Sequence, residues 1–63
     1  MAMFRVKISR TFADDFRDFA LKEELPYTTS IFKSDYAVFL TTSTFLVSFV
    51  FLWCEYIYIE RIK

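Results

Sequence analysis

The stretch that decides the fold runs from Tyr36 to Ile59 and reads YAVFLTTSTFLVSFVFLWCEYIYI. Its first 19 residues, Tyr36 to Cys54, carry no charge, whereas twelve of the sixteen charged residues of the chain lie in the 35 residues before it. As a helix, an uncharged segment of this length extends for roughly 28 Å, which is close to the thickness of a bilayer core. The pattern therefore predicts a transmembrane helix over residues 36–59.

Residues 36–59 have two other interpretations, a buried core helix and a cleaved signal sequence. A core helix this apolar needs a large partner, and a signal sequence does not begin 35 residues into a chain. The abundance of Val, Phe, Thr and Ile is typical of a strand, but more than about 20 residues without a turn signal is far longer than a normal strand. Length favours the membrane helix.

Aromatic side chains mark both ends of the predicted span. Tyr36 stands at its start, and Trp53, Tyr56 and Tyr58 stand near its end. Because Tyr and Trp prefer the headgroup layers of a bilayer, we expect these four residues to be interface aromatics.

A stripe of small and polar residues follows one face of the predicted span. At about 100° per residue, its five members lie within about 40° of one line. They are Ala37, Thr41, Thr44, Ser48 and Glu55. Small residues let two helices approach closely, and hydroxyl groups bond across the contact, so the stripe predicts a docking face for another membrane helix. In the alternative interpretation, the hydroxyl groups bond back to carbonyl groups of their own helix.

The residues before the span divide into three parts. Residues 1–10 form an extended basic arm, which alternates as a short strand laid on a partner does. Residues 11–25 predict an amphipathic helix with Thr11 as its N-cap, and residues 26–35 form a connector. With residues 60–63 as a polar C-terminal stub, the sequence predicts an all-α membrane protein with one transmembrane helix, preceded by a short amphipathic helix and an extended N-terminal arm.

The predicted amphipathic helix carries three phenylalanines on one face. Phe12, Phe16 and Phe19 recur at a spacing of four and three residues. An apolar stripe of this kind needs a groove or a membrane surface, so we expect the three side chains to be anchors of the arm.

Composition excludes several kinds of site. The chain has 63 residues, no His, no Gly, one Cys and a formal net charge of zero. These counts argue against a zinc site, an internal disulfide bond and a phosphate-binding loop. Zero net charge argues against a nucleic-acid binder held by a positive field. We therefore expect no cofactor, no metal ion and no catalytic centre.

Basic residues lie unequally on the two sides of the predicted span. Six precede it and only Arg61 and Lys63 follow it. The positive-inside rule then places the N-terminus in a bacterial cytosol or a mitochondrial matrix. The absence of acidic residues from the first thirteen is typical of a transit segment, so an uncleaved import signal and a plain basic arm are both open.

Short runs around the predicted span resemble known membrane subunits. Leu25, Pro26 and Tyr27 precede the span, and a basic residue ends the sequence. This order is similar to cytochrome c oxidase subunit VIIc. A gapped series of residues is similar to the span of subunit 9 of ubiquinol-cytochrome c reductase: Phe32 and Lys33, then Ala37, Val38 and Phe39, and further on Phe49, Val50 and Phe51. As a whole, the plan resembles the small single-pass accessory subunits of mitochondrial respiratory-chain complexes.

This resemblance implies a non-catalytic subunit of an electron-transport complex in the mitochondrial inner membrane, with its N-terminus on the matrix side. Such a subunit supports assembly and stability, and its partners are larger membrane subunits and lipid rather than nucleic acid. An alternative is a small single-pass regulator that binds a transporter or channel reversibly. A third is a subunit of a photosynthetic or bacterial membrane complex.

Overall fold

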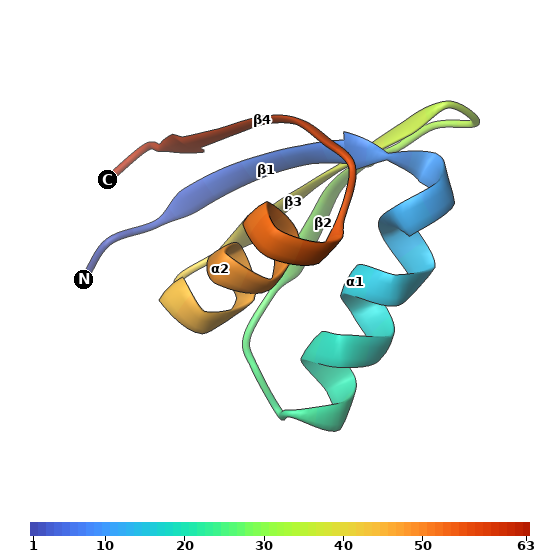
Figure 1. Ribbon diagram of the computed structural model, residues 1–63. Helices are drawn as coiled ribbons and strands as arrows, with labels where there is room; N and C mark the ends of the chain where they lie inside the picture. Colours follow the sequence, from blue (N-terminus) through green and yellow to red (C-terminus); the bar gives the residue numbers. More distant parts are fainter.

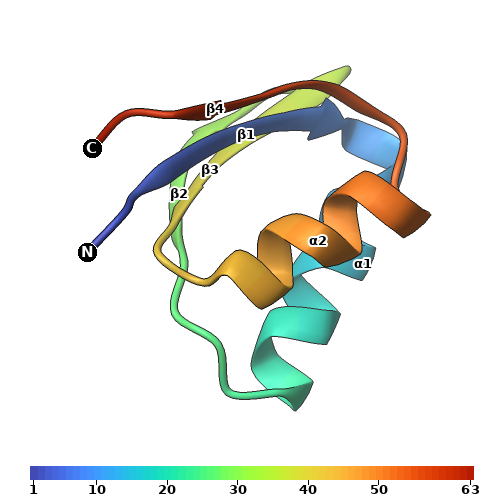
Figure 2. The ribbon, with the colours of Figure 1, turned by 60° about the vertical axis from the view of Figure 1, so that its left-hand side comes forward.

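Strands and helices alternate along the chain in the order β-α-β-β-α-β. The computed structural model describes residues 1–63 and contains β1 (Phe4–Ser9), α1 (Arg10–Lys22), β2 (Thr28–Phe32), β3 (Tyr36–Thr41), α2 (Thr44–Trp53) and β4 (Tyr56–Arg61). The strands form one antiparallel sheet in the order β2-β3-β1-β4. Both helices lie on the same face of this sheet (Figure 1 and Figure 2). This connectivity is the ferredoxin-like, or split β-α-β, arrangement.

The predicted transmembrane helix over residues 36–59 is wrong. That stretch forms β3, α2 and the first part of β4, and α2 has only 10 residues. No helix of the structure has both the length and the apolar character needed to cross a membrane. The fold is therefore α/β rather than all-α. The same finding overturns the predicted single-pass protein of the mitochondrial inner membrane with its N-terminus in the matrix.

A run of hydroxyl side chains divides the apolar stretch into short elements. Ser43 is the N-cap of α2, and its hydroxyl oxygen accepts a hydrogen bond from the backbone N–H of Leu46 at 3.1 Å. The Thr41 hydroxyl donates to the carbonyl oxygen of Pro26 at 2.7 Å and accepts from the N–H of Ser43 at 3.0 Å. These side chains satisfy the backbone where the chain turns, so one long helix does not form.

The hydrophobic core lies between the sheet and the two helices. It consists of nine buried residues: Val6, Ile8, Ala13, Phe16, Ala20, Ala37, Phe39, Leu46 and Val50. At its centre the ring of Phe16 from α1 stacks on the ring of Phe39 from β3, with centroids 4.2 Å apart. The core therefore joins α1 to the central strands, and α2 adds two residues from the side.

The strand and the helix expected in the N-terminal half are present, with changed surroundings. Strand β1 does not lie on a partner, because it pairs with β3 on one side and β4 on the other. Helix α1 starts after Ser9, and the predicted cap at Thr11 does not form. The predicted connector contains β2, and the predicted C-terminal stub begins inside β4.

Helix α1 ends at Lys22, whereas the sequence predicts that it continues to residue 25, directly before Pro26. Glu24 follows with a φ of 55°, a left-handed conformation that usually falls to glycine at a helix end. Since the chain contains no glycine, a residue with a β-carbon takes this position.

The two ends of the chain meet at one end of the sheet. The backbone N–H of Met3 donates to the carbonyl oxygen of Lys63 at 3.1 Å, and the N–H of Ile62 donates to the carbonyl oxygen of Met3 at 2.8 Å. The N and C labels lie side by side in Figure 1 and in Figure 2.

Candidate functional site

Large apolar side chains are exposed along α2 and the start of β4. Six of them are between 36% and 73% exposed: Phe45, Phe51, Leu52, Trp53, Tyr56 and Ile57. We call these six residues the α2 patch. Phe45, Leu52 and Trp53 line one hollow of the surface, and Phe51, Leu52 and Tyr56 line another. Scattered exposed apolar residues are normal, but such a gathering of large ones usually marks an interaction site.

The α2 patch exists because α2 carries large apolar side chains on its solvent side as well as on its core side. Leu46 and Val50 are fully buried against the core, whereas Phe45, Phe51 and Leu52 of the same helix are more than half exposed. A helix that is hydrophobic all round is normally enclosed. Here the sheet and α1 enclose only one side, so the other side lacks a cover.

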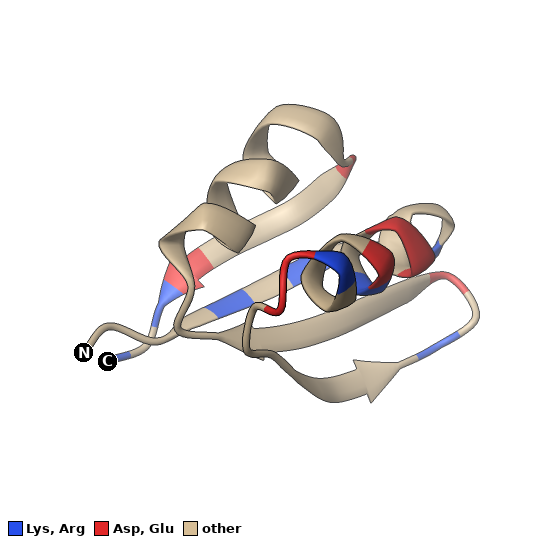
Figure 3. Cartoon of the chain, turned by 90° about the horizontal axis from the view of Figure 1, so that it is seen from below, with Lys and Arg blue, Asp and Glu red and all other residues tan.

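Charge is distributed very differently over the two helices. Figure 3 shows both signs of charge along α1 and none along α2. On α1, Asp14 lies between Arg10 and Arg17, with oxygen-to-nitrogen distances of 3.8 and 3.5 Å. The exposed side of α1 is therefore a charged surface that water solvates well, whereas the exposed side of α2 carries no charge.

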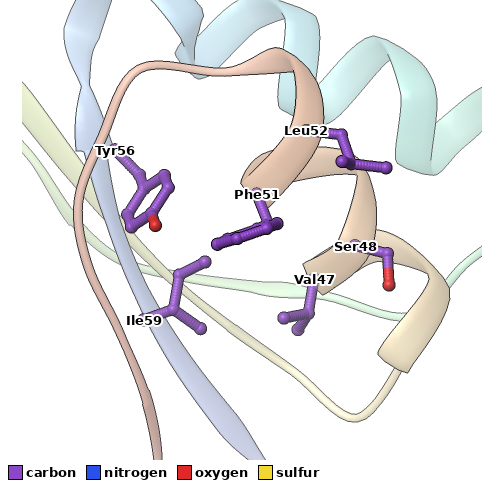
Figure 4. Close-up of a pocket in the computed structure, with 6 residues that line it drawn as sticks. All are labelled: Val47, Ser48, Phe51, Leu52, Tyr56 and Ile59. Atoms are coloured by element: carbon purple, nitrogen blue, oxygen red, sulfur yellow. The ribbon is translucent and has the colours of Figure 1, made fainter.

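A groove with a volume of about 450 Å³ lies between α2 and β4. Figure 4 shows the six residues that line it: Val47, Ser48, Phe51 and Leu52 from the helix, and Tyr56 and Ile59 from the strand. The rings of Phe51 and Tyr56 lie 5.9 Å apart at one end of the groove. A second groove of about 190 Å³ follows the α1 side of α2 and includes Phe19 and Phe49. Both grooves are mainly apolar, and Ser48 contributes to both.

The five residues of the predicted docking stripe do not share one face. Ala37 and Thr41 are buried in β3, Thr44 and Ser48 are exposed on α2, and Glu55 is exposed between α2 and β4. The stripe assumed one continuous helix, which the turn at Thr42 and Ser43 interrupts. Of the five, only Ser48 lies in the groove beside the α2 patch.

The three predicted arm anchors pack inside their own chain. Phe16 is fully buried, and Phe12 and Phe19 are half-buried. The ring of Phe19 stacks on the ring of Phe49 with centroids 4.0 Å apart, which fixes α1 against α2. Phe19 therefore helps to position α2, and Phe16 belongs to the core of its own chain.

The four predicted interface aromatics fall into two groups. Trp53 and Tyr56 belong to the α2 patch. Tyr36 and Tyr58 lie on either side of Lys7, on the face of the sheet that points away from the helices. The Lys7 Nζ atom is 4.2 Å from the ring centroid of Tyr36 and 5.9 Å from that of Tyr58, which are cation–π distances.

The single cysteine lies directly after α2. Burial, with a smaller contribution from the negative charge of Asp15, raises the pKa of the Cys54 thiol to about 11. The thiol is thus protonated at neutral pH and is a weak nucleophile. No group of three or more Cys, Asp or Glu side chains is gathered as a metal site.

Of the six residues of the α2 patch, the sequence pattern identifies only Trp53 and Tyr56 as candidate site residues. One available signal was the hydroxyl run from Thr41 to Thr44, followed after a further ten residues by Glu55. Together they delimit a short uncharged helix of the length found in small domains. Reading that helix as apolar on every side predicts an exposed apolar surface.

Known proteins supply no relative from which a function could be carried over. The resemblance to respiratory-chain subunits therefore stays a prediction. Searches against protein families, curated proteins and solved structures each found no match.

Proposed function

We propose that this protein is a non-catalytic interaction module, an accessory component of a larger protein assembly, and that it acts by docking its α2 patch onto another chain of that assembly. The observation that carries this proposal is the apolar solvent side of α2. Its exposed side chains carry no charge and are mostly large and apolar, so recognition depends mainly on shape and on the removal of apolar surface from water.

The size of the α2 patch supports a protein interface. A fully exposed large aromatic residue presents roughly 200 Å², so the six partly exposed residues together present on the order of 700 Å². Monomeric proteins rarely leave a contiguous apolar area that large uncovered. Trp53 and Phe51 are side chains of the kind that dominates binding energy when enclosed in a partner.

The absence of basic residues from α2 argues for protein rather than lipid as the cover. Helices that lie on a membrane surface combine an apolar face with a polar face rich in Lys and Arg. The ten residues of α2 include neither Lys nor Arg, and the only hydroxyl residues among them are Thr44 and Ser48.

A charged substitution in the α2 patch tests the proposal, and the chain offers a matched control. Leu52 on α2 is 69% exposed, and Leu21 on α1 is 66% exposed but lies outside the patch. We expect Leu21→Glu and Leu52→Glu to fold equally well, as judged by circular dichroism. Only Leu52→Glu is expected to leave the assembly.

The measurement is a native gel of cells that naturally express the protein, with a tagged copy at its natural level. Wild type and Leu21→Glu should migrate in one larger assembly at a fixed ratio to its other components. A fixed ratio identifies an accessory component, whereas a reversibly bound regulator is lost on washing. If Leu52→Glu stays in that assembly at the same ratio, the α2 patch is not the interface and the proposal is wrong.

A further inference from the structure

We infer that the partner covering the α2 patch is a second copy of this chain, in a two-fold symmetric dimer in which α2 packs across α2. The inference rests on the proposed function, because it takes the same surface as the interface. It adds the identity of the partner and the arrangement of the two helices.

The first argument is area. A stable interface of standard size needs roughly 800 Å² from each partner, and the six residues of the α2 patch supply on the order of 700 Å² before their neighbours are counted. One copy of the patch therefore matches what each side of a dimer contributes. A much larger partner surface is not needed to cover it.

The second argument is charge. A two-fold interface brings each residue close to its own counterpart, so a charged surface meets its own sign near the axis. The α2 patch carries no charge, and it is compatible with itself in this respect. The exposed side of α1, with six charged residues, is the opposite case.

Glu55 determines the direction in which the helices cross. It is exposed directly beyond the C-terminal end of α2. An antiparallel crossing places the two Glu55 carboxylates at opposite ends of the contact, whereas a parallel crossing brings them together without a basic partner on α2. We therefore assign the antiparallel arrangement.

The third argument is shape. The grooves of about 450 and 190 Å³ flank α2 on its two sides. Helices pack by placing rows of side chains from one helix into grooves beside the other. Phe51 and Leu52 of the second copy are the bulky exposed side chains that can enter these grooves, and the symmetry makes the exchange mutual.

The fourth argument is the small size of the fold. Only 11 of the 63 residues are buried. Domains of this length often gain stability by oligomerisation, since a single core of this size is marginal. A dimer through α2 joins two such cores into one continuous apolar interior.

The test is the molar mass of the purified full chain, measured by sedimentation equilibrium over a range of concentrations. We expect wild type and Leu21→Glu to have twice the monomer mass of 7.6 kDa. Leu52→Glu should weaken the dimer about 100-fold, because it buries an unpaired charge at the centre of the contact.

Cysteine cross-linking gives a second readout that leaves the fold intact. In a Cys54→Ala background, Ser48→Cys places a thiol on the exposed side of α2, and Ser30→Cys places one on the exposed strand β2. Mild oxidation should join two chains through position 48 and not through position 30. Equal cross-linking at both positions would contradict the dimer.

The outcomes separate this inference from the proposed function. A wild-type chain that is monomeric at the highest concentration overturns the dimer. If Leu52→Glu is then still lost from the cellular assembly, a different protein covers the patch and the proposed function stands. If Leu52→Glu changes neither the mass nor the assembly, both proposals fail. Tight binding of monomers to phosphatidylcholine vesicles also overturns the dimer, in favour of lipid.

Discussion

The pKa of the Cys54 thiol depends on its burial and on how close the C-terminal end of α2 lies to Asp15 on α1. Asp15 belongs to α1 and Cys54 follows α2, yet the aspartate charge acts on the thiol. Burial is the larger cause, and both effects disfavour the thiolate, so the pKa of Cys54 rises to about 11.

The rate of thiol alkylation by iodoacetamide tests this effect. In the folded protein the rate should rise with pH with a midpoint of about 11, whereas in urea the midpoint should be near the ordinary pKa of roughly 8.5. The raised pKa means that the protonated thiol stabilises the fold below the unfolded-state pKa. This contribution is lost as the pH rises through the folded-state pKa.

Asp15→Asn provides the control for the cysteine experiment. It removes the smaller of the two causes, so the folded-state midpoint should fall but stay above that of the unfolded chain. A folded-state midpoint equal to the unfolded one would show that Cys54 is as accessible to water as in the unfolded chain.

Elements with a regular pattern could be predicted from the sequence, and those without one could not. Strand β1 alternates, and α1 repeats its apolar residues with the helical period, so both were recognised. In β3, α2 and the first part of β4 most residues are apolar, and no period distinguishes strand from helix. Thr41 and Ser43, which make the break, are also common inside membrane helices.

Ser43→Ala tests whether the N-cap defines where α2 begins. The Ser43 hydroxyl accepts from the N–H of Leu46, and the loss of such a cap costs about 1 kcal/mol of folding free energy. Ser48→Ala is the control, since Ser48 is exposed within the same helix and makes no cap. Urea unfolding of the two variants measures the difference. Equal midpoints would mean that packing of Leu46 and Val50 alone sets the start of α2.

At the scale of the whole molecule, the sequence predicts lipid as the cover of the apolar half of the chain, whereas the fold itself buries part of that half, including Phe39, Leu46 and Val50. Large apolar side chains such as Trp53 and Phe51 are stabilised by burial both among lipid tails and in a protein interface. A membrane-spanning helix and a short helix in a folded domain differ in whether the helix is continuous over the whole stretch. That continuity depends on hydrogen bonds at one turn. The exposed part of the patch therefore emerged from the fold and not from composition.

The stability of the whole domain depends on very few buried rings. Phe16 contacts both Phe39 and Tyr27, with centroids 4.2 and 5.7 Å away. Phe16→Ala should cost about 3–5 kcal/mol, while a domain of this size has only about 3–9 kcal/mol in total. We expect a large unfolded fraction at 25 °C, visible in amide NMR spectra. Leu21→Ala is the control: because Leu21 is exposed, this variant should unfold at the same urea concentration as wild type. A wild-type NMR spectrum for Phe16→Ala would contradict the assigned core.

The contact between Met3 and the last two residues has a consequence for engineering this domain. Because the backbone of Met3 is hydrogen-bonded to both Ile62 and Lys63, a short peptide bridge would close the chain into a ring without bending the sheet. New termini could then be opened in the exposed hairpin between β2 and β3. The same proximity would let the whole unit be inserted into a surface loop of a host protein, where it would leave and re-enter the host backbone at nearly one point.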